Sequence, residues 1–554
     1  MTDSLTIALA QVNPTVGDLA GNVARIRAQR AEAAKAGADL VVFTELTVCG
    51  YPPEDLVLRP SFQAATAAAV DGLAADTADG GPAMIVGALR VENGLLHNAA
   101  FLLDGGKIAA VRLKHDLPNY GVFDEKRVFA AGPLPGPMSF RGVRLGVMVC
   151  EDMWTPDVTE CLQESGAELL LVVNGSPYET AKHDERVNLA VARVTESKLP
   201  LIYINQVGGQ DELVFDGASF VLGADCSLRA QAKAWHEDLL VTKWTRGDEG
   251  VWSCAETRRE PPPDGHEGVY QALVLGLRDY VRKNGFPGVL IGLSGGIDSA
   301  LAAVLAVDAL GAKNVRCVMM PSPYTSKESL DDAAEIARLL GIRLDNVSIG
   351  PAMEAFGAML NPLFDGLPPN TAEENIQARA RGMTLMALSN KFGHMVLSTG
   401  NKSEMSVGYA TLYGDMCGGY AILKDVYKME VYALSRWRNQ VKPDGALGPT
   451  GRVIPENVLT RAPTAELKPN QTDQDSLPPY AQLDDILSCL VEGEMPVDEV
   501  VKRGHPREVV GRVWTMLMRA EYKRRQAPPG VKISRRAFGR DRRYPIVNGF
   551  ADRT

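Results

Sequence analysis

The 554-residue sequence lacks the features that mark membrane, secreted and zinc-finger proteins. It has no run of about 18 apolar residues, which excludes an ordinary transmembrane helix. Its first residues, MTDSLTIALAQVNP, show neither the basic start nor the long apolar stretch of a secretory signal, so we expect none. Its eight cysteines include no CxxC pair. In a chain of this size, that predicts reduced thiols in a cytoplasm rather than a disulfide framework or a zinc site.

Basic residues are also in short supply. The 58 Lys and Arg residues stand against 68 Asp and Glu, which gives a net charge of −10. This argues against broad binding to nucleic acid or to an anionic membrane, so any anionic ligand must be held by a local cluster of donors. The 45% hydrophobic and 23% charged composition is ordinary for a soluble globular protein, and the length predicts two large domains or three smaller ones.

The first half of the sequence alternates short apolar strands with helical stretches. The expected strands are 5–12, 38–45, 83–89, 98–103, 143–150, 168–173 and 200–205, and the expected helices are 20–36 and 183–198. Such alternation predicts a layered α/β fold with a buried sheet.

A break between two domains is expected at 245–267, where charge, glycine and a proline triplet accumulate. We therefore divide the chain into an N-terminal domain at 1–245, a linker at 246–266 and a C-terminal domain at 267–554. Beyond the linker the pattern is βαβ, typical of a doubly wound nucleotide-binding fold. Its expected helices are 268–284, 298–310 and 326–340, and its expected strands are 288–293, 315–321 and 394–399.

The segment Gly292-Leu-Ser-Gly-Gly-Ile-Asp-Ser299 lies between one of these strands and an Ala/Leu-rich helix. Its glycines let backbone N–H groups approach phosphates, and the helix N-terminus favours negative charge there. Asp298 supplies a hard oxygen ligand for Mg²⁺. Because no Lys-Ser/Thr pair ends the segment, the Walker cradle is missing. The segment instead resembles the pyrophosphate loop of ATP pyrophosphatases, which implies cleavage of ATP between the α- and β-phosphates and formation of an adenylate.

Three residues of the first half, Glu45, Lys114 and Cys150, end apolar strands and are followed by polar segments. Catalytic groups often lie where a rigid strand meets a loop. Cleavage of an amide through a thioester needs a thiolate, which the adjacent Glu151 and Asp152 disfavour. A nearby cation and a proton acceptor therefore become necessary, and we expect Lys114 and Glu45 in these roles.

The contexts of these three residues resemble the nitrilase family of amidases, whose catalytic set is Glu, Lys and Cys. The alternative is that Cys150 is an inert buried cysteine, as we expect for Cys161 and Cys226.

The C-terminal half contains further segments that resemble the site of NAD⁺ synthetases. They are EENIQAR (373–379), STGNKSE (398–404), YGD (413–415), LKDVYK (423–428), PTAEL (463–467) and EYKR (521–524). With the nitrilase-like half, the chain resembles the glutamine-dependent NAD⁺ synthetase family over about 5–245 and 265–540. This implies a nitrilase-like α-β-β-α sandwich followed by a doubly wound parallel-sheet domain of the adenine nucleotide alpha hydrolase type. It also implies a cytoplasmic, homo-oligomeric ligase that amidates deamido-NAD⁺ with ATP and glutamine.

The same resemblance implies binding residues for each substrate. The implied glutamine contacts are Tyr120, Ser176 and Lys182, with Glu125 and Glu179 orienting Lys114 and the substrate. The implied ATP contacts are Gly292, Leu293, Ser294, Gly295, Gly296, Ile297, Asp298, Ser299 and Thr399, with Thr464 as a further candidate. The implied deamido-NAD⁺ contacts are Asn375, Glu404 and Lys523, and the implied Mg²⁺ ligands are Asp298 and Glu404. Each of these residues, taken alone, could be an ordinary surface residue. Because the segments follow the octet in the order of the family, each assignment supports the others.

Other proteins combine some of these features. GMP synthetases need a Cys-His-Glu glutaminase, which the seven histidines do not form, and asparagine synthetases need a cysteine where this chain has Thr2. The pyrophosphate loop also occurs in tRNA-thiolating enzymes, which usually add CxxC pairs or a basic surface. Here only the basic stretch 534–546 points that way. A non-enzymatic glutamine sensor is the remaining alternative, against which the Glu-Lys-Cys set argues.

Overall fold

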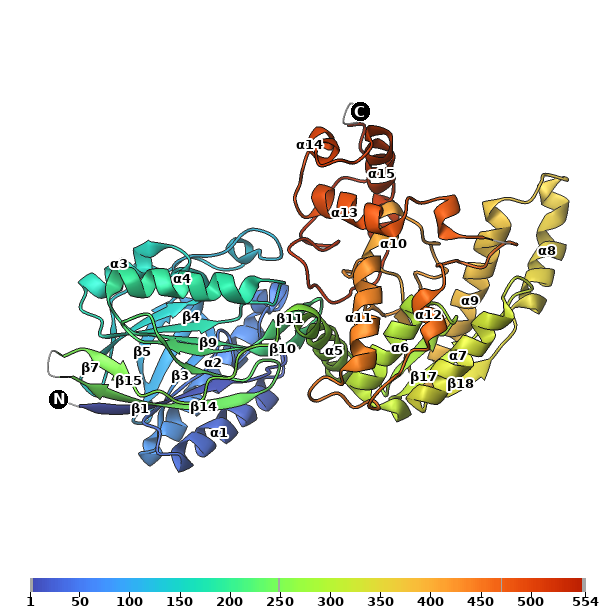
Figure 1. Cartoon of the computed structure of the whole chain (residues 1–554). Helices are drawn as coiled ribbons and strands as arrows, with labels where there is room; N and C mark the ends of the chain where they lie inside the picture. Colours follow the sequence, from blue (N-terminus) through green and yellow to red (C-terminus); the bar gives the residue numbers. More distant parts are fainter. Residues whose placement is uncertain (1–2, 248–249, 470, 551–554) are drawn as a thin grey trace. The chain divides into compact units, whose positions relative to one another are not determined.

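The computed structural model describes residues 3–247, 250–469 and 471–550. By its internal contacts the chain divides into two compact units, Met1–Asp264 and Gly265–Thr554 (Figure 1). Each unit has its own hydrophobic clusters. Among the described residues, no helix is long and apolar enough to cross a membrane.

The first unit contains two main sheets. One has the strand order β15-β14-β1-β2-β3-β4-β5 and the other the order β13-β12-β9-β8-β7-β6. The strands of the first sheet are β15 (Trp252–Cys254), β14 (Asp238–Arg246), β1 (Ser4–Gln11), β2 (Leu40–Val42), β3 (Ala83–Glu92), β4 (Leu95–Asp104) and β5 (Lys107–Leu113). The strands of the second are β13 (Leu228–Gln231), β12 (Phe220–Leu222), β9 (Leu201–Asn205), β8 (Leu169–Asn174), β7 (Val143–Val149) and β6 (Met138–Phe140). A short ribbon pairs β10 (Val207–Gln210) with β11 (Leu213–Asp216).

The side chains of β1 show how the layers form. Successive residues of a strand point to opposite faces of the sheet. Ile7 and Leu9 accordingly enter the core between the two sheets, whereas Ala8 and Ala10 enter the core under the helices α1 (Leu19–Lys35) and α2 (Pro60–Asp76). Because both faces are covered, the strand is continuously apolar from Ile7 to Ala10.

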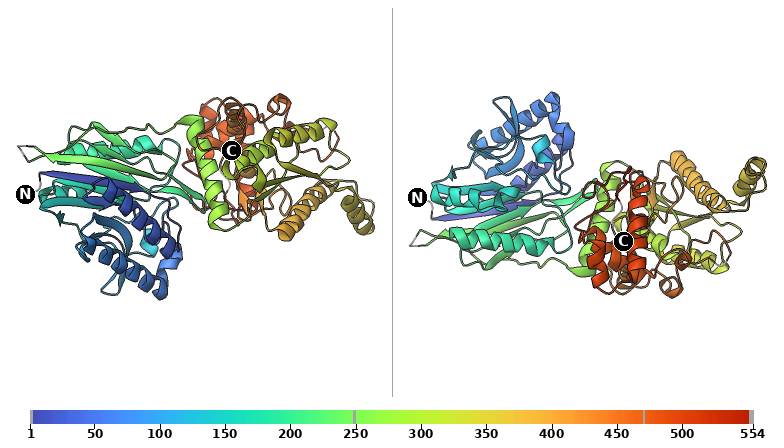
Figure 2. Two further views of the ribbon diagram at one scale, coloured as in Figure 1. Left: turned by 90° about the horizontal axis from the view of Figure 1, so that it is seen from below. Right: turned by 90° about the horizontal axis from the view of Figure 1, so that it is seen from above.

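The second sheet is covered in the same way by α3 (Pro156–Glu164) and α4 (Lys182–Ser197). Figure 2 shows α1 and α2 (blue) and α3 and α4 (teal) on opposite sides of the strands. The expected α-β-β-α sandwich is therefore confirmed.

Two further stretches of this unit form regular secondary structure. The Ala-rich stretch 64–78 contributes to α2, whose Val70 and Leu73 pack under the first sheet. Within the expected linker, 246–266, the segment Trp252–Cys254 forms the edge strand β15. Trp252 is buried between the sheets, so its apolar surface outweighs the charge and glycine around it.

The sheet of the second unit has the order β18-β17-β16-β19-β20, and every pair in it is parallel. Its strands are β18 (Arg343–Asn346), β17 (Val315–Met319), β16 (Val289–Gly292), β19 (Met395–Ser398) and β20 (Tyr420–Ala421). The main helices beside or between them are α5 (Gly265–Lys283), α6 (Ile297–Leu310), α7 (Lys327–Leu340), α9 (Thr371–Phe392) and α11 (Lys428–Gln440). This is the expected doubly wound fold.

The strand order has a consequence for ligand binding. From β16 the chain moves outward through β17 to β18, and then returns to β19 on the other side of β16. Ligands of such sheets bind at the carboxyl ends of the two strands where this direction reverses. The octet follows β16, and the segment 398–404 ends β19 and begins α10 (Lys402–Val407). The fold therefore brings two of the quoted segments to one edge of the sheet.

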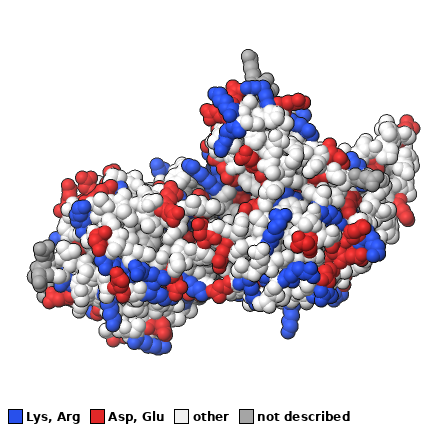
Figure 3. Space-filling view, viewed as in Figure 1, with Lys and Arg blue, Asp and Glu red and all other residues white. Residues whose placement is uncertain are grey.

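The remaining helices of the second unit form two groups. The helix α10 packs with α13 (Tyr480–Val491), α14 (Val497–Lys502) and α15 (Arg507–Arg519) around a separate apolar cluster. The helix α8 (Gly350–Phe364) packs against α9. On the face of the molecule drawn in Figure 3, basic and acidic side chains are interspersed rather than segregated.

Candidate functional site

The first candidate site is centred on Cys150, which directly follows β7. Its φ is +48°, a left-handed conformation that is strained for a side chain other than glycine. Cys150 as a whole is 4% exposed. A buried strand thus ends in a sharp turn that holds a single thiol in one orientation.

Asp152 stabilises this turn from within. Its carboxylate accepts the backbone N–H of Val149 at 2.9 Å, of His115 at 2.9 Å and of Asp116 at 2.8 Å. Burial raises the pKa of Asp152 to about 6, while these N–H groups favour its ionised form. The residues after Lys114 are thereby tied to the residues around Cys150.

Glu45 and Lys114 form a fully buried ion pair at the ends of β2 and β5. Lys114 Nζ donates to Glu45 Oε1 at 2.8 Å. Asn98 Nδ2 donates to the same oxygen at 2.7 Å, and the Gly175 N–H donates to Glu45 Oε2 at 2.9 Å. These three donors hold the carboxylate of Glu45 in one position.

Glu125 is a second buried carboxyl group beside the same lysine. Lys114 Nζ donates to Glu125 Oε1 at 3.0 Å and to Oε2 at 2.9 Å, and the Tyr51 hydroxyl donates to Glu125 Oε1 at 2.9 Å. Burial raises the pKa of Glu125 to about 7, against the charge of Lys114, which lowers it. Glu125 therefore contacts Lys114 through both carboxylate oxygens, and its implied role in orienting the lysine stays a prediction.

The thiol of Cys150 lies in the field of these charges. Burial, followed by the charge of Glu45, raises the pKa of Cys150 well above its ordinary value, while the charge of Lys114 lowers it. Glu151 adds a smaller unfavourable charge. Burial and Glu45 thus disfavour the thiolate of Cys150, and Lys114 is the charge that favours it.

Each of the three residues that the resemblance implies as glutamine contacts has neighbours or burial that the structure describes. The Tyr120 hydroxyl donates to both carboxylate oxygens of Glu151, at 3.0 and 3.1 Å. Lys182 Nζ lies 4.2 Å from the ring centroid of Trp154. Ser176 is 4% exposed and follows the Gly175 that donates to Glu45.

The second candidate site is built on the octet. Gly295 has φ +83°, and a Cβ there would lie 2.3 Å from the carbonyl oxygen of Ser329, so the turn needs glycine. The Ser294 N–H donates to Ser299 Oγ at 3.2 Å, and the two hydroxyls are 3.1 Å apart. The turn therefore closes on itself just before α6, with Asp298 in the first turn of that helix.

Asp298 and Glu404 share a cation. Lys428 Nζ lies 2.5 Å from Asp298 Oδ2 and 3.2 Å from Glu404 Oε1. Asn401 Nδ2 donates to the other oxygen of Asp298 at 2.8 Å. Two carboxylates from the first turns of α6 and α10 are thus directed at one point.

A cavity of about 300 Å³ opens beside these groups. The predicted residues that line it are Gly292, Leu293, Ser294, Gly295, Gly296, Ile297, Asp298, Ser299, Thr399, Glu404 and Thr464. Lys428 lines it as well, and its volume is within the range of small-molecule sites.

Asn375 and Lys523 are not among the lining residues, but both form hydrogen bonds to the loop 408–411, which contributes to the lining. Lys523 Nζ donates to the carbonyl oxygens of Gly408 and Ala410, at 2.7 and 2.6 Å. Asn375 Oδ1 accepts the Thr411 hydroxyl at 2.9 Å. Ala410 lines the cavity, so these two predicted residues contact a loop of the cavity wall and not the cavity itself.

Two protein families match this chain, one in each of its two units. Residues 6–253 match the carbon-nitrogen hydrolase family and residues 269–527 match the NAD synthase family. The glutamine-dependent NAD(+) synthetase of Rhodobacter capsulatus is 50% identical over 555 residues, which cover 100% of both chains. The chain belongs to the glutamine-dependent NAD(+) synthetase family.

Further members of the glutamine-dependent NAD(+) synthetase family agree. The enzyme of Xanthomonas campestris pv. campestris is 47% identical over 99% of this chain and 98% of its own. The solved structure of the Acinetobacter baumannii enzyme, in complex with adenosine diphosphate, is 42% identical, covers 100% of both chains and has a TM-score of 0.78. The resemblance drawn from the sequence is thereby confirmed. The other interpretations, RNA modification and glutamine sensing, are not the activity for which these relatives are named.

For a member of this family, several residues at the two sites were not identified from the sequence. Asn98 and Gly175, which hold Glu45, lie in an expected strand and beside the implied contact Ser176, but the sequence assigned no role to either. Asn401 and Lys428, which bind Asp298, lie in two of the quoted segments, 398–404 and 423–428. The resemblance placed those segments at the site, but it did not indicate that these side chains contact Asp298.

Proposed function

We propose that the chain forms NAD⁺ by amidating the carboxylate of deamido-NAD⁺, with nitrogen from glutamine and with ATP converted to AMP and pyrophosphate. The observation that carries the proposal is the presence of two separate centres of charged residues in one chain. Glu45, Lys114 and Cys150 form the first, and Asp298 and Glu404 at the octet form the second. We assign the first reaction to 1–245 and the second to 267–554, with 246–266 between them.

In the first reaction, Cys150 Sγ attacks the carboxamide carbon of glutamine while its proton passes to Glu45. Lys114 favours the developing thiolate and the tetrahedral oxyanion by its charge, since its N–H groups are engaged by Glu45 and Glu125. The protonated Glu45 returns the proton to the leaving nitrogen, and ammonia departs from a thioester. Water activated by Glu45 then hydrolyses the thioester to glutamate.

Glutamine is held by Tyr120, Ser176 and Lys182 in this proposal. The ammonium of Lys182 suits the α-carboxylate of the substrate, and Glu151, which accepts the Tyr120 hydroxyl, suits its α-amino group. The free thiol at Cys150 supports the same chemistry. A reducing compartment such as the cytoplasm would keep it in that form.

In the second reaction, the carboxylate of deamido-NAD⁺ attacks the α-phosphorus of ATP and pyrophosphate leaves. Ammonia then attacks the carbonyl carbon of the adenylate, and AMP leaves. The octet and Thr399 hold ATP in this proposal, because its turn offers N–H groups and hydroxyls at a helix N-terminus. Asn375, Glu404 and Lys523 hold the dinucleotide.

Asp298 and Glu404 are suited to hold Mg²⁺. Mg²⁺ prefers oxygen ligands and is commonly bound by one or two carboxylates together with substrate phosphates. Both carboxylates lie within reach of the single ammonium of Lys428, so they can also address one metal ion. When bound, the ion would neutralise phosphate charge beside the octet.

The proposal includes a homo-oligomer formed through α8 and α9. These helices expose large apolar side chains that a monomer would leave in water. They are Phe356 at 42%, Met359 at 65%, Leu363 at 76% and Met383 at 72% exposure. No side chain of α8 with a described placement is buried within its own unit.

Two assays test the proposed function. Deamido-NAD⁺, ATP and glutamine are supplied together, and NAD⁺, AMP and pyrophosphate are measured. Cys150→Ala should abolish NAD⁺ formation from glutamine but spare it with high ammonium, because Cys150 serves nitrogen release alone. Loss of both activities in a folded variant would show that this division of labour is wrong.

A further inference from the structure

The turn Gly175–Pro177, which follows β8, is packed directly against the general base. The Gly175 N–H donates to Glu45 Oε2 at 2.9 Å. A Cβ at Gly175 would lie 2.7 Å from Cδ1 of Tyr51 and 3.2 Å from Glu45 Oε2. The turn therefore has no room to shift without disturbing Glu45.

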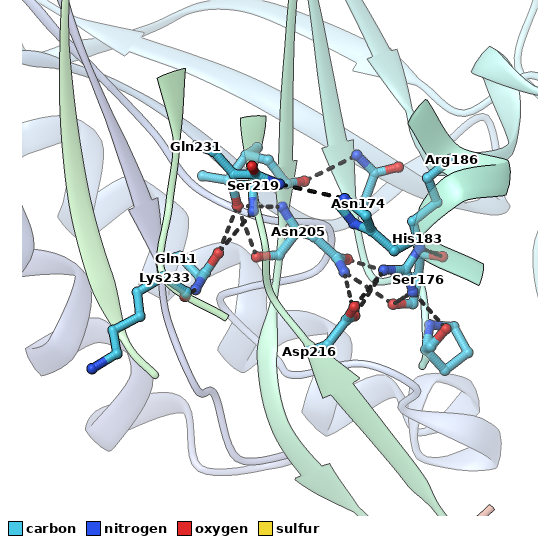
Figure 4. A network of polar contacts seen from close by, with 12 residues as sticks. Gln11, Asn174, Ser176, His183, Arg186, Asn205, Asp216, Ser219, Gln231 and Lys233 are labelled. Atoms are coloured by element: carbon cyan, nitrogen blue, oxygen red, sulfur yellow. Dashed lines mark hydrogen bonds and ion pairs between the residues drawn. The ribbon is translucent and has the colours of Figure 1, made fainter. Parts of the chain in front are cut away.

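Arg186, on α4, holds this turn with its whole guanidinium group (Figure 4). Its Nη2 donates to the carbonyl oxygens of Ser176 and Pro177, at 2.9 and 2.6 Å, and its Nε donates to Ser176 Oγ at 3.0 Å. Its Nη1 donates to Asp216 Oδ1 and Oδ2, at 2.7 and 2.9 Å. All three nitrogens of the guanidinium are thus engaged as donors.

Asn205 forms further hydrogen bonds to the backbone of Ser176. Asn205 Oδ1 accepts the Ser176 N–H at 2.9 Å, and Asn205 Nδ2 donates to the Ser176 carbonyl oxygen at 3.0 Å. Asn205 is held in turn by Ser219, whose hydroxyl accepts the Asn205 N–H at 3.0 Å and donates to Gln11 Oε1 at 2.8 Å. Figure 4 shows this network running from Gln11 to Arg186. The N–H, carbonyl and hydroxyl of Ser176 are thus all bonded to neighbours on other elements.

We propose that Arg186 is a positioning residue of the glutaminase reaction, which sets the Gly175–Pro177 turn and through it the general base Glu45 and the glutamine pocket. The inference rests on the proposed function of Cys150. Arg186 acts without touching glutamine, since its donors are directed at the turn and at Asp216. Asp216 keeps the guanidinium oriented, and burial of the pair at 1% and 3% exposure shields these bonds from water.

The planar fork of arginine is essential to this role. A lysine at position 186 would keep a positive charge beside Asp216, but it cannot bond two carbonyl oxygens, a hydroxyl and a carboxylate in one plane. The variant Arg186→Lys therefore separates charge balance from positioning. Because a single neutral replacement would leave Asp216 buried without its cation, the double variant Arg186→Met with Asp216→Asn removes both charges together.

The matched control is Arg30→Met. Arg30 is 8% exposed and also binds a carboxylate, Asp79, and a backbone carbonyl, that of Pro82, but it lies on α1 away from the turn. For every variant, kcat and KM for glutamine hydrolysis are measured with thermal unfolding by circular dichroism. Ammonium-dependent NAD⁺ formation in the same preparation reports on the second unit.

Arg186→Lys and the double variant should lose glutaminase kcat/KM by on the order of 100-fold, the scale of a misplacement of about 1 Å at a reaction centre. Ammonium-dependent synthesis and the glutaminase of Arg30→Met should be unchanged. Normal glutaminase in a folded Arg186→Lys variant, or an equal loss in Arg30→Met, overturns the inference. Cys150→Ala is assayed in parallel: if it still hydrolyses glutamine, the proposed function itself fails, whereas an inactive Cys150→Ala beside a normal Arg186→Lys refutes the role of Arg186 alone.

Discussion

The ammonium group of Lys428 lies 2.5 Å from Oδ2 of Asp298, at the point where the sheet of the second unit reverses direction. Glu404 is 3.2 Å from the same nitrogen. Two partly buried carboxylates so close together would repel each other without a cation between them. The site is therefore built around positive charge, and a divalent ion can take part in the same balance.

Asp298→Asn and Glu404→Gln should each raise the Mg²⁺ concentration needed for AMP production. An amide is a much poorer ligand than a carboxylate, and even loss of an outer-shell partner typically costs roughly tenfold in metal affinity. Mg²⁺ titrations of AMP formation measure the effect. Glutamine hydrolysis alone should change little, and the exposed Asp331→Asn on α7 serves as control. An unaltered Mg²⁺ requirement in both variants would remove these residues from the metal site.

A folded Lys114→Met variant should lose glutaminase activity by orders of magnitude. The attraction between two unit charges about 4 Å apart is about 4 kcal/mol at an intermediate dielectric, enough to offset the neighbouring acids. Arg at position 114 should rescue only in part, because its fork cannot reproduce the compact ammonium between Glu45 and Glu125. Glutamine hydrolysis is measured against Lys107→Met, a change at the exposed start of the same strand. Near-normal hydrolysis in the Met variant would mean that another cation does this work.

The reactivity of Cys150 with iodoacetamide should keep rising with pH. Burial raises the pKa of this thiol well above its ordinary value, so the reactive thiolate is a small fraction that grows about tenfold per pH unit. In the unfolded chain, labelling of the same peptide should level off near the ordinary thiol pKa of about 8.5. Alkylation of the Cys150 peptide is followed by mass spectrometry, with Lys114→Met expected to react more slowly still. A plateau in the folded protein below that pH would show that the resting thiol is ionised.

Charged residues on α8 should dissociate the proposed oligomer. Met359→Glu combined with Leu363→Glu places two charges in a face that is 65% and 76% exposed at these positions. Burying an unpaired charge on association is strongly unfavourable, so the mass measured by light scattering should fall to that of one chain. Leu447→Glu, at an exposed apolar residue outside α8 and α9, is the control. An unchanged mass in the double variant would assign the interface to another surface.

Local patterns determined a large part of this protein. The apolar run 143–150 predicted the strand Val143–Val149, and the octet was expected between a strand and a helix, where β16 and α6 enclose it. Periodicity and glycine spacing are properties of neighbouring residues, so they survive into the fold. The motifs around Cys150 and the octet were specific enough to indicate the family.

The contacts that make the two sites work were decided by the tertiary structure alone. Glu45 and Lys114 meet although β3 and β4 separate β2 from β5, and Cys150 follows a strand of the other sheet, so no local pattern could predict this contact. Asp152, expected only to burden the thiolate, turns its carboxylate to three backbone N–H groups. The five bonds of Arg186 likewise join β8, α4 and β11. Buried charges need partners, and which partner is within reach depends on how distant segments pack.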